Sequence, residues 1–137
     1  MSVREELIAA ARRARKNAYA PYSTFSVGAA IRSRSRRAYK GCNVENSTFG
    51  LSVCAERVAL WNALSAGERD FELLAVVADT DQLTPPCGAC RQILWEFCGD
   101  LEILLANLQG RVEVHRLAEL MPRPFDARFL RRPGNRV

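Results

Sequence analysis

The 137-residue sequence has no apolar run that approaches the length of a membrane-spanning helix; its longest runs are short, such as LLAVVA at residues 73–78. Its first twenty residues, MSVREELIAAARRARKNAYA, include early acidic side chains and no apolar stretch ending in a cleavage site, so they do not resemble a secretory signal. These two absences argue against a helical membrane protein and an exported one. We therefore expect a cytoplasmic protein with no membrane partner.

The cysteines do not form the pattern of a disulfide framework. Their number is odd, no export signal accompanies them, and a reducing cytosol disfavours structural disulfides. Any group of them is therefore better interpreted as a metal site or a catalytic site. The five cysteines are Cys42, Cys54, Cys87, Cys90 and Cys98.

Aromatic residues are also scarce, at 8% of the chain, although the chain is basic, with 20 Lys and Arg against 15 Asp and Glu. The excess of positive charge gathers at residues 12–16, 32–37 and 123–136. The first two clusters contain no aromatic side chain on which bases could stack. This pattern favours a solvated helix face, a hairpin turn and a C-terminal tail over a nucleic-acid-binding surface.

Hydrophobic periodicity predicts helices that alternate with strands. The alternation indicates an α/β protein whose helices cover a layered sheet, in a single domain at residues 1–130 followed by a mobile tail at 131–137. The expected helices lie at 3–18, 54–66, 88–97 and 117–120, and the expected strands at 25–31, 38–44, 73–79, 102–106 and 111–115.

Three cysteines lie at the predicted starts of two helices. Cys54 begins one, and Cys87 and Cys90 form a Cys-x-x-Cys pair at the start of the next. Helix N-termini carry partial positive charge and free N–H groups, which favour thiolate, the form of cysteine that binds metal. Cys-x-x-Cys spacing lets two sulfurs reach one ion, and zinc is the usual occupant. If the helices pack side by side, the three sulfurs would hold one zinc ion.

The fourth zinc position separates a structural site from a catalytic one. Cys98 lies roughly 12 Å further along its helix and cannot reach, whereas Cys42 and His115 remain possible in principle. Glu56, two residues after the first ligand, favours an open position. Its carboxylate could take a proton from water there and pass it to a substrate, which is general acid–base catalysis at an electrophilic carbon.

Arg57 and Arg91 each directly follow a ligand motif. Three thiolates on a dication leave a net charge of about −1, which weakens the pull of the metal on water. Either arginine could donate hydrogen bonds to the sulfurs and offset this charge. The alternative is that both are surface arginines.

Several sequence blocks resemble the small, homotetrameric type of zinc-dependent cytidine deaminase, within the wider pattern of zinc deaminases that pair cysteine ligands with a non-ligand glutamate. The resemblance covers about residues 5–126. The blocks are APYS at 20–23 with Phe25 and VGAA at 27–30, GCNVEN at 41–46, CAER at 54–57, PCGACRQ at 86–92, and LMP at 120–122 with Phe125.

The resemblance implies a fold, an activity and an assembly. The fold would be a three-layer αβα sandwich with a mixed five-stranded sheet. The activity would be hydrolytic deamination of cytidine and 2′-deoxycytidine to the uridines, in pyrimidine salvage, with one Zn²⁺ per chain. The assembly would be a homotetramer whose sites are shared between subunits. The implied zinc ligands are Cys54, Cys87 and Cys90, and the implied proton shuttle is Glu56.

The resemblance also implies which residues contact the nucleoside. Asn43 and Glu45 would hydrogen-bond the ribose, mainly at its 3′-hydroxyl. Phe25 would pack against the pyrimidine, and the backbone around Ala55 would contact groups on the base. Phe125 would reach into the site of a neighbouring subunit. By residue type alone, the two phenylalanines are also typical of a core or interface, and Asn43 and Glu45 of a turn.

The chain departs from the family pattern at two positions. Phe49 stands where the family commonly has Tyr, which removes a hydroxyl expected to contact the ribose 5′-hydroxyl from a neighbouring subunit. Losing such a contact weakens discrimination at the 5′ position. Trp61 stands where smaller residues are usual, which would alter subunit packing.

Two alternative functions follow from the same residues. A deaminase of a modified cytosine nucleoside, of the blasticidin type, would share the zinc chemistry, as would a deaminase of nucleic-acid bases; the NVEN block at 43–46 favours a free ribose over a polymer. A non-catalytic zinc module that binds nucleic acid through its basic patches would need a fourth protein ligand, which the spacing does not supply.

Overall fold

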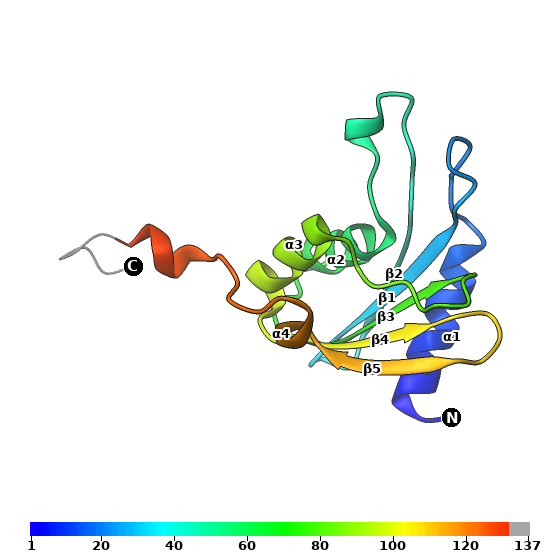
Figure 1. Cartoon of the computed structure of the whole chain (residues 1–137). Coiled ribbons are helices and arrows are strands. Elements are labelled where there is room, and N and C mark those ends of the chain that lie inside the picture. Colours follow the sequence, from blue (N-terminus) through cyan, green and yellow to red (C-terminus); the bar gives the residue numbers. More distant parts are fainter. Residues whose placement is uncertain (132–137) are drawn as a thin grey trace.

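One mixed five-stranded sheet organises the chain in the computed structural model, which describes residues 1–131 (Figure 1). The expected helices and strands are present, although the first helix ends at Arg15, three residues before its predicted end. The elements are α1 (Val3–Arg15), β1 (Val27–Ser33), β2 (Ala38–Cys42), the 3-10 helix η1 (Phe49–Leu51), α2 (Ala55–Ser65), β3 (Phe71–Ala78), α3 (Gly88–Cys98), β4 (Glu102–Ala106), β5 (Val112–Arg116), α4 (Leu117–Leu120) and the 3-10 helix η2 (Ala127–Leu130).

The strand order is β2-β1-β3-β4-β5. Only β3 and β4 run parallel, because α3 crosses over between them, and the other neighbouring pairs are antiparallel. Val27 at the start of β1 pairs with Ala78 at the end of β3. The carboxyl end of β3, from which the chain leads into α3, therefore lies beside the entry to β1, and the candidate site forms at this edge of the sheet.

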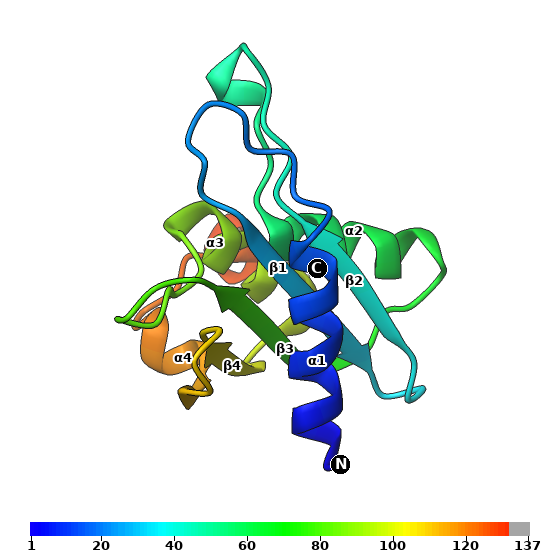
Figure 2. The same ribbon diagram turned by 90° about the vertical axis from the view of Figure 1, so that its right-hand side faces the viewer.

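The sheet has a helical layer on each face, which confirms the expected αβα sandwich. Leu7, Ala10 and Ala11 of α1 pack on one face, and α2 and α3 pack on the other. Figure 2 shows α1 crossing the strands on the near side, with α2 and α3 behind them. Gly28 allows the close approach of α1, because a Cβ there would lie 2.0 Å from the carbonyl oxygen of Ala11.

A long arm follows β2 before the chain returns to α2. Val44 and Val53 pair across its base, and η1 lies at its tip, which Figure 1 shows extending away from the sheet. The arm carries exposed apolar side chains, with Phe49 72% and Leu51 70% exposed. It therefore presents a surface of the kind that subunit contacts cover.

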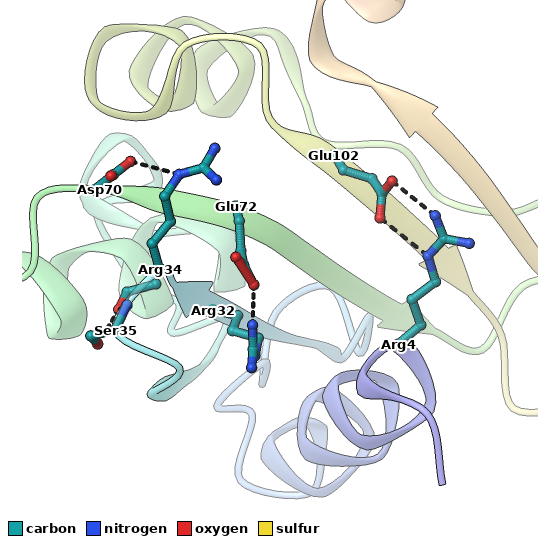
Figure 3. A network of polar contacts seen from close by, with 8 residues as sticks. Arg4, Arg32, Arg34, Ser35, Asp70, Glu72 and Glu102 are labelled. Atoms are coloured by element: carbon teal, nitrogen blue, oxygen red, sulfur yellow. Dashed lines mark hydrogen bonds and ion pairs between the residues drawn. The ribbon is translucent and has the colours of Figure 1, made fainter.

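Several of the arginines that make the chain basic are paired with carboxylates (Figure 3). An exposed pair contributes only about 0–1 kcal/mol to stability, but the pairs at Arg32 and Arg34 neutralise part of the positive charge of the β1–β2 hairpin. This agrees with a solvated hairpin. The pairs are Arg4 with Glu102, Arg32 with Glu72, and Arg34 with Asp70.

Within residues 1–131, no helix is both long enough and apolar enough to cross a membrane. The expected tail at 131–137 falls almost wholly outside the described residues, which exclude 132–137. Its mobility, and the boundary of the single domain at residue 130, stay predictions.

Candidate metal centre and active site

The N-termini of α2 and α3 bring three cysteine sulfurs together. Cys54 is the N-cap residue of α2, Cys87 is the N-cap residue of α3, and Cys90 lies in the first turn of α3. The Sγ atom of Cys87 lies 3.8 Å from that of Cys54 and 3.5 Å from that of Cys90. All three sulfurs lie within 4.8 Å of one another. The side-by-side packing expected of these helices is therefore present.

The spacing of these sulfurs fits a zinc ion. A tetrahedral zinc with Zn–S bonds of about 2.3 Å separates its sulfurs by about 3.8 Å, close to the measured 3.8 and 3.5 Å. Three thiolates this close repel one another, and a divalent cation removes that repulsion. Among the described residues, no fourth His, Cys, Asp or Glu atom joins the group. The donor set is thus that of a zinc site with one position left for a non-protein ligand.

Arg57 lies against this group. Its Nη2 atom donates to Sγ of Cys54 at 3.4 Å. Hydrogen bonds from Cys90 and then from Arg57 lower the pKa of Cys54 to about 5, so Cys54 favours the thiolate form. The Nε–H of Arg57 is buried and has no hydrogen-bond partner among residues 1–131. The guanidinium therefore brings positive charge to the sulfurs, as expected from the sequence.

Arg91 makes different contacts in the described structure. Its Nε donates to the carbonyl of Pro86 at 2.8 Å and its Nη1 to the carbonyl of Leu120 at 2.6 Å. These bonds tie the loop before Cys87 to the end of α4. Arg91 thereby fixes the backbone that carries the sulfur, and the expected hydrogen bond from Arg91 to the sulfurs stays a prediction.

Glu56, in the first turn of α2, is 4% exposed. Burial raises the pKa of its carboxyl to about 7. A carboxyl group with a pKa near neutrality can both accept and return a proton under physiological conditions. Its position, beside the sulfurs and facing the same cavity, is what a proton shuttle requires.

A cavity of about 210 Å³ opens at this edge of the sheet. Residues of the metal group line it, together with most of the residues predicted for nucleoside binding, including Ala55. Its size and its mixture of apolar walls with a few polar groups are typical of a small-molecule site. The wall includes Phe25, Asn43, Glu45, Cys54, Glu56 and Cys87.

Asn43 and Glu45 hold the neighbouring loop. Asn43 Oδ1 accepts from the backbone N–H of Val27 at 2.9 Å, and its Nδ2 donates to the carbonyl of Phe25 at 2.7 Å. Glu45 Oε1 accepts from the N–H groups of Tyr22 at 2.9 Å and Ser23 at 3.1 Å. Both side chains therefore shape the wall that carries Phe25. Their contact with a ribose stays a prediction.

Ser23 supports the cavity wall through Glu45 and Phe25, although no individual role was predicted for it. Its hydroxyl donates to Glu45 Oε2 and accepts from the N–H of Phe25 at 3.0 Å. The sequence placed it only in the APYS block, at a break after the first helix. A serine two residues before an aromatic residue, in a turn, was the available signal, because serine hydroxyls often bond the backbone of turns.

Phe125 is not one of the residues that line the cavity of its own chain. Its ring is 57% exposed and stacks on Phe129, with centroids 5.8 Å apart. Gln92 of α3 donates to the carbonyl of Phe125 at 2.8 Å, and the indole Nε1 of Trp95 donates to Asp126 at 2.9 Å. The backbone of this segment is thus fixed to α3 while its aromatic side chains face outward.

Together, the αβα sheet and a three-sulfur group beside a buried glutamate define the class of zinc-dependent deaminases. The family model described as the cytidine and deoxycytidylate deaminase zinc-binding region matches residues 1–104. The chain is 49% identical over 122 residues to a cytidine deaminase of Sporosarcina psychrophila, covering 88% of this chain and 90% of that one. It is 48% identical to a cytidine deaminase of Halalkalibacterium halodurans, covering 90% and 95%.

Solved structures agree with this relationship. A cytidine deaminase from Burkholderia pseudomallei superposes with a TM-score of 0.86 at 48% identity, covering 91% of this chain and all of that one. One from Mycobacterium tuberculosis superposes with a TM-score of 0.79 at 36% identity, covering 92% and 99%. The chain belongs to the cytidine deaminase family.

Proposed function

We propose that this protein is a zinc-dependent hydrolase that deaminates cytidine and 2′-deoxycytidine to uridine and 2′-deoxyuridine, as a step of pyrimidine salvage. One observation carries the proposal: a single cavity is lined by Cys54 and Cys87 of the three-sulfur group, by Glu56, and by the polar pair Asn43 and Glu45. The names of the related proteins support cytidine as the substrate.

The three cysteines and Glu56 have separate roles in the proposed reaction. Zinc held by Cys54, Cys87 and Cys90 would supply a Lewis acid that makes water a nucleophile near neutral pH. Glu56 takes a proton at its carboxylate and delivers it to N3 of the cytosine ring as C4 is attacked. Glu56 then moves a second proton to the leaving amino group, so that water and cytidine become uridine and ammonia. The raised pKa of Glu56 suits it to both transfers.

The nucleoside is held by the remaining wall of the cavity. Asn43 and Glu45 hydrogen-bond the ribose, chiefly at its 3′-hydroxyl, and Phe25 packs on the pyrimidine. The backbone at Ala55 contacts groups on the base. Phe49, which lacks a hydroxyl, leaves discrimination at the 5′ position weak.

The enzyme works as a homotetramer whose sites are shared, with Phe125 reaching into a neighbouring subunit. The exposure of Phe125 at 57% and Phe49 at 72% supports this assembly, because large exposed apolar side chains of this kind mark contact surfaces. We place the enzyme in the cytoplasm. Its metal group needs reduced cysteines, and all five cysteines of the chain are free thiols.

An ultraviolet assay with zinc analysis of the purified chain tests the function. Cytidine and 2′-deoxycytidine are expected to be deaminated by protein holding one zinc per chain, with cytosine and oligonucleotides poor substrates. Blasticidin S belongs in the same assay, because a blasticidin-S deaminase of Bacillus cereus is 29% identical over 104 residues. Activity on blasticidin S or oligonucleotides without activity on cytidine would overturn the proposal, as would active protein without metal.

A further inference from the structure

The turn before β1 carries Phe25 to the cavity, and its backbone is strained. Thr24 has a φ of 58°, in the left-handed region that a β-branched residue rarely adopts. Its N–H donates to the carbonyl of Ala20 at 3.0 Å. A residue held in this conformation persists only where its surroundings fix it, so other groups must stabilise the turn.

Glu45 stabilises the turn from outside it through three hydrogen bonds. Its Oε1 atom accepts two backbone N–H groups, those of Tyr22 and Ser23, and its Oε2 atom accepts the hydroxyl of Ser23. These hydrogen bonds also lower the pKa of Glu45, the largest cause being the Ser23 hydroxyl, so the group is a carboxylate in this arrangement.

The hydroxyl of Ser23 links this carboxylate to Phe25. It donates to Glu45 and accepts the backbone N–H of Phe25 at 3.0 Å. The ring of Phe25 is 41% exposed and lines the cavity that also holds Glu56. A displacement of the Glu45 carboxylate would therefore move the Ser23 hydroxyl and with it the backbone of Phe25.

We propose that Ser23 is a positioning residue of the active site, whose hydroxyl couples the sugar-binding carboxylate of Glu45 to the placement of the Phe25 ring against the base. This inference rests on the proposed function, because it takes Glu45 as the sugar contact and Phe25 as the base contact. A ribose hydroxyl that donates to Glu45 meets an acceptor already aligned by Ser23. Binding of the sugar and alignment of the base thus reinforce each other.

The experiment replaces the hydroxyl and then restores it. Ser23→Ala is expected to raise KM for cytidine about tenfold with kcat changed less than about twofold, because Glu45 and the backbone of Phe25 lose the hydroxyl that aligns them for binding. Ser23→Thr keeps a hydroxyl and is expected to recover most of the loss. Ser65→Ala is the matched control, since Ser65 is exposed at the end of α2 and outside the cavity wall.

A double-mutant cycle with Phe25→Leu separates positioning from general destabilisation. If Ser23 acts through the ring of Phe25, adding Ser23→Ala to Phe25→Leu raises KM by clearly less than the tenfold expected in the parent, because only the effect of Ser23 on Glu45 remains. A full tenfold effect in that background would overturn the proposal, as would an unchanged KM in Ser23→Ala alone or no recovery with threonine. If the parent protein does not deaminate cytidine at all, the proposed function fails before the cycle begins, so the two failures are distinguishable.

Discussion

The guanidinium of Arg57 contacts the sulfur of Cys54 from one helical turn away, with Nη2 and Sγ 3.4 Å apart. Cys54 and Arg57 belong to the same helix. The helix therefore provides both a thiolate for the metal and a guanidinium that offsets part of the negative charge of that thiolate. Arg57→Gln removes that charge, and zinc affinity is expected to fall about tenfold or more, the usual loss when a group that orients a ligand is removed. Competition with a chromophoric chelator measures it. Arg12→Gln, on the exposed face of α1, is the control, and equal affinities in all three proteins would contradict the role of Arg57.

Glu56→Gln is expected to keep the fold and the metal but to lose turnover by a factor of about 10² to 10⁴, because an amide cannot carry the proton. Steady-state kinetics measures the loss of turnover, and metal analysis of the same preparation checks that zinc is retained. Glu96→Gln, at an exposed position of α3, should keep the parent rate. Turnover by the Glu56 variant near the parent rate would exclude Glu56 as the shuttle.

Chelation is expected to lower the melting temperature, because the cation stabilises only the folded arrangement of three thiolates. Zinc should restore it and magnesium should not, since thiolates favour softer metals. Cys90→Ser should lower the melting temperature and abolish the response to chelator. Cys98→Ser, in the same helix but outside the group, should keep the response. A chelator response that survives in the Cys90 variant would place the metal elsewhere.

Gly28→Ala is expected to destabilise the fold by about 3 kcal/mol, because the added Cβ would lie 2.0 Å from the Ala11 carbonyl oxygen and α1 would have to move off the sheet. Gly50→Ala adds the same atom where nothing lies within 4 Å and should have little effect. Urea unfolding of the two variants compares them directly. Equal stabilities would show that α1 does not approach β1 this closely.

The carboxylate of Asp126, which accepts from Arg128 and Trp95, has a pKa below its usual value, chiefly because of the hydrogen bond from Arg128. Since the folded-state pKa is lowered, this group stabilises the docked segment above its unfolded pKa of about 3.9, and the contribution is lost as the pH falls through the folded-state value. In a Trp61→Phe background, Trp95 fluorescence is therefore expected to stay constant from pH 7 to about pH 3.9, where an aspartate of ordinary pKa would already be half protonated.

Asp126→Ala in the same background should shift that fluorescence already at pH 7, because the indole N–H loses its partner. A fluorescence titration of the Asp126 protein centred near pH 3.9 would contradict the lowered pKa. A variant spectrum identical to that of the parent at pH 7 would show that the segment is not anchored by this hydrogen bond.

Most of the fold could be predicted from the sequence, because it follows from local patterns. Alternating helices and apolar strands, and cysteines at helix starts, indicated both the layers and the metal group. The hydrogen-bond partners inside the site could not be predicted. Glu45 reaches Ser23 across 22 positions, and Trp95 reaches Asp126 across 31. Such hydrogen bonds depend on how the helices, strands and loops pack together, and local sequence patterns do not predict that packing.

Arg91 illustrates the same limit. Its place after a ligand motif did not indicate the two backbone carbonyls to which its guanidinium donates, one of them 29 positions away at Leu120. Arg57, three residues after Cys54, donates to the sulfur of that residue. Side-chain direction on each helix, and not proximity in sequence, separates the two cases.

Of the three clustered cysteines, Cys87 is exposed, Cys54 partly buried and Cys90 buried. An oxidant arriving from solvent would thus meet Cys87 first, and a neighbouring thiol 3.8 Å away would readily trap the oxidised sulfur as a disulfide. Protein inactivated in this way would regain its activity only with a reductant and zinc supplied together. Storage history would then set the active fraction of a preparation.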